Sequence, residues 1–190
     1  LLDEQSGRII EAALKKGGVK ILYTSLVEEV TGSTHVEGVR LIDGTTLPAD
    51  MIMAGVGTQC DLDWIKAAGI ACGTGVLTDE FLETSAKDVF AAGDVAEYQD
   101  VLLEEHIQLG NWVNAHLHGK TAAANMLGGH TPFRQVSFYT AQGFGTVIAF
   151  VGDVRVVEER TVITRGSLES GAVTRVILRD GEIEGATMVN

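Results

Sequence analysis

The stretch that decides the fold is TSAKDVFAAGDVA, which spans residues 84–96. Its apolar core, residues 89–92, predicts a buried strand, and Gly93-Asp94 breaks that strand sharply. Such a strand delivers one carboxylate at its carboxyl end, the edge at which doubly wound sheets bind ligands. The small side chains before Asp94 would let a ligand approach the backbone, and Asp94 could accept hydrogen bonds from sugar-type hydroxyls. An aspartate that caps a helix fits the same spacing, so both interpretations stay open.

Upstream of this stretch the sequence predicts a helix, short strands and a second, shorter helix. Apolar side chains recur at helical spacing over residues 3–16, and Gly17-Gly18 supplies a left-handed stop. Asp43-Gly44 is a strong hairpin signal. Strands are expected at residues 19–23, 26–30, 36–42 and 51–54, and a short helix at 62–68.

Downstream, the clearest helix of the chain is expected over residues 109–127, ended by Gly128-Gly129. The pattern then becomes almost entirely strand, with expected strands at residues 136–139, 146–151, 154–162 and 173–189, the last containing an Asp180-Gly181 turn. We expect residues from Phe133 onward to form a separate, mainly antiparallel β unit packed against the 109–127 helix. Mixed α/β structure followed by a β-rich end indicates two layers of different architecture.

Composition excludes several classes of function. The chain has 190 residues, of which 45% are hydrophobic and 21% charged, so it can bury a real core. Fourteen Lys and Arg against 26 Asp and Glu give a net charge of −12, which disfavours nucleic acid and anionic membranes as partners. No apolar run is long enough to span a bilayer. Two cysteines make no disulfide framework, so a reducing, cytoplasmic location is expected. The chain begins Leu1-Leu2-Asp3 without methionine, and we expect it to be part of something larger.

Three weaker patterns receive structural interpretations. Gly55-Val56-Gly57 follows an expected strand but lacks the third glycine of a dinucleotide fingerprint, so a strand-end turn is the safer interpretation. His116 and His118 lie two residues apart on a helix and point to different faces, so we expect a solvated pair and no metal site. Cys60 and Cys72 are expected to be core or loop thiols rather than a redox pair.

Several motifs in the right order carry a family resemblance over nearly the whole chain. Residues 84–96 resemble the second flavin-binding motif of the FAD-dependent pyridine nucleotide-disulfide oxidoreductase superfamily. Residues 55–57, 67–70 and 75–79 resemble the segment that returns the chain from the NADH domain to the FAD domain. The sequence NWVNA at residues 111–115 and residues 119–128 resemble the following helix in ferredoxin and rubredoxin reductases and in apoptosis-inducing factor. Residues 137–140 with Phe144-Gly145 resemble the opening of the family's C-terminal domain.

The resemblance implies a fold and its division into domains. The fold class would be α/β, with partial Rossmann-like FAD- and NAD(P)-binding portions followed by an α+β, mainly antiparallel β C-terminal domain. Residues 1–70 would be the C-terminal part of the NAD(P)H-binding domain, 71–132 the returning part of the FAD-binding domain, and 133–190 a truncated β-rich C-terminal domain. Both G-x-G-x-x-G loops of such reductases are absent from this sequence, so we expect a C-terminal fragment that is itself inactive.

The resemblance also implies cofactor contacts, although no catalytic residue is assigned. Gly93, Asp94 and Val95 would contact FAD, with Asp94 on the ribityl chain and Val95 at the pyrimidine edge. Asn111 and Trp112, at the start of the next helix, would lie near the isoalloxazine, where a helix N-terminus stabilises reduced flavin. The loop made by Gly55, Val56 and Gly57 would border the nicotinamide of NAD(P)H. The family often has a glutamate where this chain has Gly110, and Glu105-His106 is a displaced substitute.

The function implied is that of an FAD-dependent NAD(P)H oxidoreductase. Hydride would pass from NAD(P)H to FAD, and electrons on to a ferredoxin-type protein, oxygen or a small molecule. The net negative charge of the chain disfavours an acidic ferredoxin as the acceptor, because the two proteins would repel each other. Self-association through the C-terminal domain is also expected. The alternative is a non-catalytic, β-rich interaction or dimerisation module that binds no cofactor.

Overall fold

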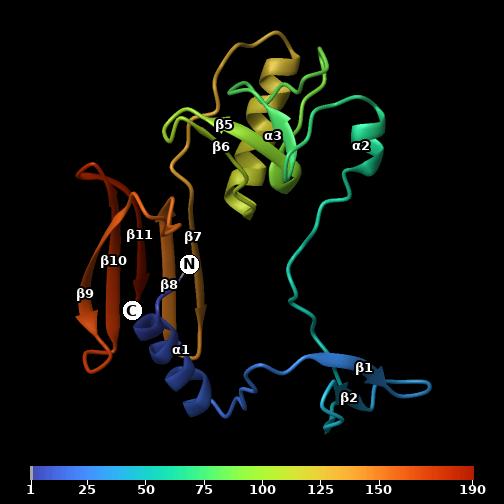
Figure 1. Cartoon of the computed structure of the whole chain (residues 1–190), viewed down its shortest axis with the longest axis vertical. Coiled ribbons are helices and arrows are strands. Elements are labelled where there is room, and N and C mark those ends of the chain that lie inside the picture. Colours follow the sequence, from blue (N-terminus) through green and yellow to red (C-terminus); the bar gives the residue numbers. More distant parts are fainter. Residues whose placement is uncertain (1) are drawn as a thin grey trace. The chain divides into compact units, whose positions relative to one another are not determined.

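The computed structural model describes residues 2–190, which form two compact units (Figure 1). The smaller unit is Lys15–Gln59, and the larger combines the residues up to Leu14 with Cys60–Asn190. The N-terminal helix therefore folds with the C-terminal part of the chain. No helix among the described residues is long and apolar enough to cross a membrane.

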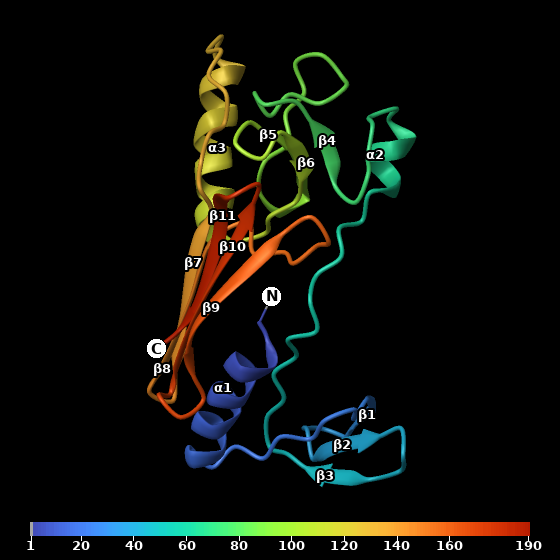
Figure 2. The ribbon, with the colours of Figure 1, turned by 60° about the vertical axis from the view of Figure 1, so that its left-hand side comes forward.

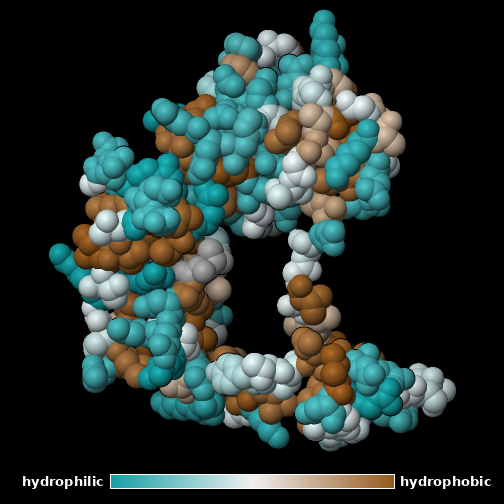
Figure 3. Space-filling model, in the orientation of Figure 1, coloured by the Kyte–Doolittle hydropathy of each residue, from teal (hydrophilic) through white to brown (hydrophobic). Residues whose placement is uncertain are grey.

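The smaller unit is built on a three-stranded antiparallel sheet of order β1-β2-β3, comprising Val27–Thr31, Gly38–Leu41 and Thr46–Pro48. The predicted hairpin turn at Asp43-Gly44 is confirmed, with Gly44 at φ +85° and its N–H donating to the Leu41 carbonyl at 2.9 Å. Residues 19–23 form no strand. The predicted buried strand at residues 51–54 is also wrong. No described strand pairs with this segment, and Met51 and Met53 are 81% and 91% exposed. Figure 3 shows hydrophobic surface along it.

The C-terminal sheet has five antiparallel strands in the order β7-β8-β11-β10-β9, visible as the orange and red arrows in Figure 2. The strands are β7 (Phe138–Gly143), β8 (Thr146–Gly152), β9 (Thr161–Ser167), β10 (Ala172–Arg179) and β11 (Glu182–Val189). Both residues of the predicted Asp180-Gly181 turn have positive φ, as a tight hairpin between twisted strands requires. This confirms the mainly antiparallel character predicted for this part of the chain, although the sheet belongs to the larger compact unit and does not form one of its own. The strand predicted over 154–162 is instead a loop that leads into β9.

The helix that covers this sheet is α1 (Glu4–Lys16), not the predicted 109–127 helix. Asp3 caps α1, its carboxylate accepting the Ser6 N–H at 3.1 Å. Ile9 of α1 packs with Val173 and Val189, which are fully buried on β10 and β11. The prediction chose the wrong helix because the sequence does not show that the chain returns to its own N-terminal helix.

The middle of the chain contains the elements around residues 84–96. They are α2 (Asp63–Ala67), β4 (Val76–Thr78), the 3-10 turn η1 (Gly93–Val95), β5 (Ala96–Asp100), β6 (Glu105–Ile107) and α3 (Trp112–Met126). Strand β5 pairs in parallel with β4 and antiparallel with β6. The mixed α/β class is therefore confirmed, with mostly antiparallel sheets.

The buried strand predicted at residues 89–92 is wrong. These residues are extended, but their sheet-like pairing is limited to one bridge between Phe90 and Glu83. The Ala91 N–H donates to the Leu82 carbonyl at 3.1 Å, and Val89 is 41% exposed. The segment therefore pairs along one edge, with residues 82–84, and does not form a regular strand.

Candidate functional site

The start of α3 provides the positive end of a fifteen-residue helix. Asn111 is its N-cap, and the Asn111 side-chain oxygen accepts the Asn114 N–H at 2.9 Å. The other end of the same amide donates to the Ser137 hydroxyl, also at 2.9 Å. The cap is therefore held on both sides, and the N–H groups of the first turn point away from the helix body.

The turn η1 packs directly against the first turns of α3. Gly93 has φ +81°, and a Cβ built on it would lie 3.4 Å from the Cβ of Ala115. A Cβ built on Gly110, which precedes the cap residue, would lie 3.2 Å from the Asp94 carboxylate carbon. Glycine at both positions lets the turn and the helix start approach closely, and it places the Asp94 carboxylate beside the N-terminus of α3.

The backbone of Asp94 is fixed while its carboxylate is free. The Asp94 carbonyl accepts a hydrogen bond from Gln108 Nε2 at 2.7 Å and a weaker one from Cys60 Sγ at 3.8 Å. In residues 2–190 no hydrogen bond or ion pair engages the carboxylate itself, which is exposed. Asp94 does not cap α3, because Asn111 does. Its oxygens are therefore available to accept hydrogen bonds from a ligand.

A buried histidine contacts the first residue of the turn. His118 lies on α3, is 1% exposed, and accepts the Gly93 N–H at Nδ1, 3.3 Å away. Burial lowers the pKa of His118 to about 4, so the ring is neutral at neutral pH. The prediction that His116 and His118 are a solvated pair is wrong for His118. His116 alone is exposed, and it stacks on Trp112 with ring centroids 5.6 Å apart.

The structure brings together five of the eight residues that the sequence suggested for cofactor binding. Gly93, Asp94 and Val95 form η1, and Asn111 and Trp112 begin α3 next to it. Trp112 is 80% exposed. Gly55, Val56 and Gly57 are exposed, belong to the smaller unit and lie in no helix or strand. The cofactor roles of all eight residues stay predictions. Within residues 2–190, no group of three or more His, Cys, Asp or Glu side chains could hold a metal ion.

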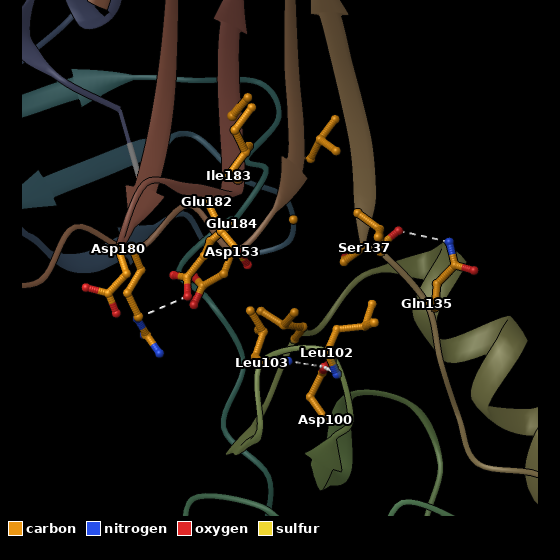
Figure 4. Close-up of a pocket in the computed structure, with 17 residues that line it drawn as sticks. Asp100, Leu102, Leu103, Gln135, Ser137, Asp153, Asp180, Glu182, Ile183 and Glu184 are labelled. Atoms are coloured by element: carbon orange, nitrogen blue, oxygen red, sulfur yellow. Dashed lines mark hydrogen bonds and ion pairs between the residues drawn. The ribbon is translucent and has the colours of Figure 1, made fainter. Parts of the chain in front are cut away.

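A cavity of about 500 Å³ opens beside the β10–β11 turn, facing the loop after β5 (Figure 4). Leu102 and Leu103 form part of its apolar side. Two of its carboxylates are already paired: buried Asp153 with Arg160 at 2.7 Å, and partly buried Glu184 with Arg160 and Arg179 at 2.5 and 3.0 Å. Asp100 accepts the N–H groups of Leu102 and Leu103. None of the eight suggested residues lines this cavity, so we place the candidate site at η1 and α3.

Comparison with protein families identifies the chain. Residues 1–119 match the family described as pyridine nucleotide-disulphide oxidoreductase. The chain belongs to this family. The predicted resemblance is thereby confirmed, and the η1–α3 junction falls within the matched residues.

Relatives of the chain include ferredoxin and rubredoxin reductases. The chain is 32% identical over 193 residues to the biphenyl dioxygenase system ferredoxin–NAD(+) reductase component of Paraburkholderia xenovorans, covering all of this chain and 46% of that protein. It is 30% identical to the rubredoxin-NAD(+) reductase of Acinetobacter baylyi, covering 92% and 44%. Putidaredoxin reductase in its covalent complex with putidaredoxin superposes with a TM-score of 0.84 at 25% identity, covering 100% and 46%. The chain thus spans less than half the length of these relatives.

Sequence reasoning missed Gln108 and His118, which bind the Asp94 carbonyl and the Gly93 N–H of η1. No local signal marks Gln108. The position of His118 does give a local signal, because residues 111, 114, 115 and 118 share one face of an α-helix.

Proposed function

We propose that this chain supplies the ribityl and pyrimidine contacts of FAD in a longer FAD-dependent NAD(P)H oxidoreductase. The observation that carries the proposal is the free carboxylate of Asp94, positioned beside the N-terminus of α3. Membership of the family and its reductase relatives support the same interpretation.

The residues present fit such a cofactor. Bound FAD supplies the redox chemistry, accepting hydride from NAD(P)H and releasing electrons to an acceptor. The exposed Asp94 carboxylate accepts hydrogen bonds from ribityl hydroxyls, and Gly93 leaves no side chain in their way. The N-terminus of α3 would supply partial positive charge to stabilise the negative charge of a reduced flavin bound there. Trp112 offers an exposed aromatic face at the same helix start.

The proposed domains follow the family's order. Residues 1–70 are assigned to the NAD(P)H-binding domain, 71–132 to the FAD-binding domain and 133–190 to the C-terminal domain. In this assignment Gly55, Val56 and Gly57 border the nicotinamide. Their exposure and lack of regular structure leave their backbone groups accessible to a ligand.

The proposed acceptor is a ferredoxin-type protein, because ferredoxin and rubredoxin reductases are among the relatives and one solved relative is a complex with putidaredoxin. With a net charge of −12, this chain would repel a strongly acidic acceptor. We therefore propose an acceptor whose docking face is neutral or basic where it meets this part of the reductase. Oxygen and small molecules remain the alternatives, and self-association through the C-terminal domain and a cytoplasmic location remain predictions.

The test is Asp94→Ala in the full-length protein, with Glu159→Ala, an exposed carboxylate on the loop before β9, as the matched control. Loss of a hydrogen bond to a charged group costs about 1.5–3 kcal/mol, so FAD affinity should fall about 10- to 150-fold in Asp94→Ala alone. The melting temperature should change little, because the carboxylate has no partner among residues 2–190. Unchanged FAD affinity with a collapsed melting temperature would make Asp94 a structural residue. A colourless wild-type protein, without flavin absorbance at about 450 nm, would favour the non-catalytic module instead.

A further inference from the structure

The histidine that touches η1 has a role in the site that its burial alone does not explain. We propose that His118 is a positioning residue: its Nδ1 fixes the Gly93 N–H and so orients the turn that presents Asp94. The consequence for cofactor binding rests on the proposed function, whereas the effect on the turn does not.

The contact joins two elements across the site. His118 lies seven residues after the Asn111 cap, on the same face of α3, and accepts the Gly93 N–H at 3.3 Å. Gly93 has φ +81°, a conformation that the turn must hold against the freedom of a glycine. A hydrogen bond at this N–H restricts the first residue of η1 and thereby the direction of Asp94, the next residue.

The ring of His118 is locked in the orientation that this contact needs. Tyr98 and Phe133 meet it edge-on, with centroids 4.6 and 4.2 Å away and interplanar angles of 84° in both pairs. Tyr98 and Phe133 are themselves nearly perpendicular at 5.4 Å. Both rings are buried, so the imidazole cannot rotate away from Gly93 without disturbing the core.

The protonation state also matches an acceptor role. Nδ1 can accept a hydrogen bond only if the ring is neutral and its proton is on Nε2. Nε2 is buried without a hydrogen-bond partner among the described residues, an arrangement that costs stability. The titratable side chain facing the ring is Tyr98, which interacts with Asp100. A leucine would fill the same space without an orphaned N–H, so the useful atom of this histidine is Nδ1.

The second hold on η1 is independent of His118. Gln108 Nε2 donates to the Asp94 carbonyl at 2.7 Å. Together the two contacts fix the backbone at the first and second residues of the turn and leave the Asp94 carboxylate unengaged. Removing His118 alone should therefore loosen the turn rather than release it.

The test measures hydrogen exchange of the Gly93 amide in the ¹⁵N-labelled chain. The variants are His118→Leu, which removes the acceptor, His118→Gln, which retains an amide oxygen, and His35→Leu, an exposed histidine of the smaller unit, as the control. Loss of one neutral hydrogen bond should accelerate Gly93 exchange about two- to tenfold in His118→Leu, with smaller or no change in His118→Gln and none in His35→Leu. Imidazole ¹⁵N shifts of the wild type should show a single neutral tautomer with the proton on Nε2.

The outcomes separate a positioning role from a purely structural one. Exchange that accelerates at Gly93 but not along the rest of α3 supports the proposal. Unchanged Gly93 exchange in His118→Leu overturns it, as does equal acceleration of every α3 amide or a ring protonated at Nδ1. In the full-length protein, FAD affinity should fall by a similar factor in His118→Leu and recover in His118→Gln. A wild type that binds no FAD while Gly93 responds as expected would refute the proposed function and leave the positioning role standing.

Discussion

The neutral, buried state of His118 predicts a specific loss of stability in acid. The ring is 1% exposed and burial lowers its pKa to about 4, whereas an unfolded histidine has a pKa of about 6.5. The unfolded chain therefore binds the proton first as the pH falls. Stability is complete above about pH 6.5 and decreases progressively toward about pH 4. At 1.36 kcal/mol per pKa unit, the full loss is about 3 kcal/mol.

The assay is urea unfolding of the wild type and His118→Gln, followed by far-UV circular dichroism at about pH 7 and about pH 4.5. Glutamine does not titrate, and the variant keeps every carboxylate, so the common acid effects cancel in the difference. Burial raises the pKa of Tyr98, which therefore stays neutral throughout this range. The wild type should lose about 2–3 kcal/mol more than the variant. Equal losses in both proteins would refute the conclusion that His118 is buried in its neutral form.

Three further predictions concern the rest of the chain. The isolated 190-residue chain should carry no tightly bound FAD, because its sequence contains no G-x-G-x-x-G loop to hold a pyrophosphate; a yellow preparation with stoichiometric flavin would refute this. Arg160→Met removes one counter-charge from buried Asp153 and partly buried Glu184, which keep Arg155 and Arg179, and should cost about 1.5–3 kcal/mol of stability in chemical denaturation. The exposed Arg165→Met should cost almost nothing. Proteinase K should cut first within residues 51–57, because they are exposed and form no strand, and should release a resistant product that begins near Cys60. First cleavage within β7–β11 would contradict the packing described for that sheet.

The sequence predicted those elements whose determinants are local. The amphipathic pattern of α1 lies within the helix itself, and the caps Asp3 and Asn111 directly precede α1 and α3. Both helices appear within a few residues of their expected bounds. The two Asp-Gly turns also appear where the dipeptides stand, because each depends on a positive φ at its glycine, and the second at Asp180 as well.

Elements that depend on a distant partner were not predictable in this way. Residues 89–92 and 51–54 are apolar enough for buried strands, but a strand exists only where a neighbour completes its hydrogen bonds. The segment 89–92 has such a neighbour along one edge, at residues 82–84, and 51–54 has none among the described residues. The packing of α1 on β10 and β11 is likewise a contact between the two ends of the chain, which no local pattern records.

In the candidate site, too, the locally determined residue was predictable and its distant partners were not. Asp94 could be found from sequence because its function depends on a local break, Gly93-Asp94, and on small neighbours that leave its carboxylate free. What orients Asp94 comes from elsewhere in the chain: Gln108 from the segment before α3, and His118 from two helical turns beyond the cap. The prediction for His118 was wrong because His118 was considered only together with His116, as a metal-binding pair or a solvated pair. Its actual partner is a backbone N–H twenty-five residues upstream, in a turn whose glycine leaves room for α3 to approach. A histidine on the buried face of a helix that starts beside a Gly-Asp turn is therefore better tested first as an acceptor for that turn than as a metal ligand.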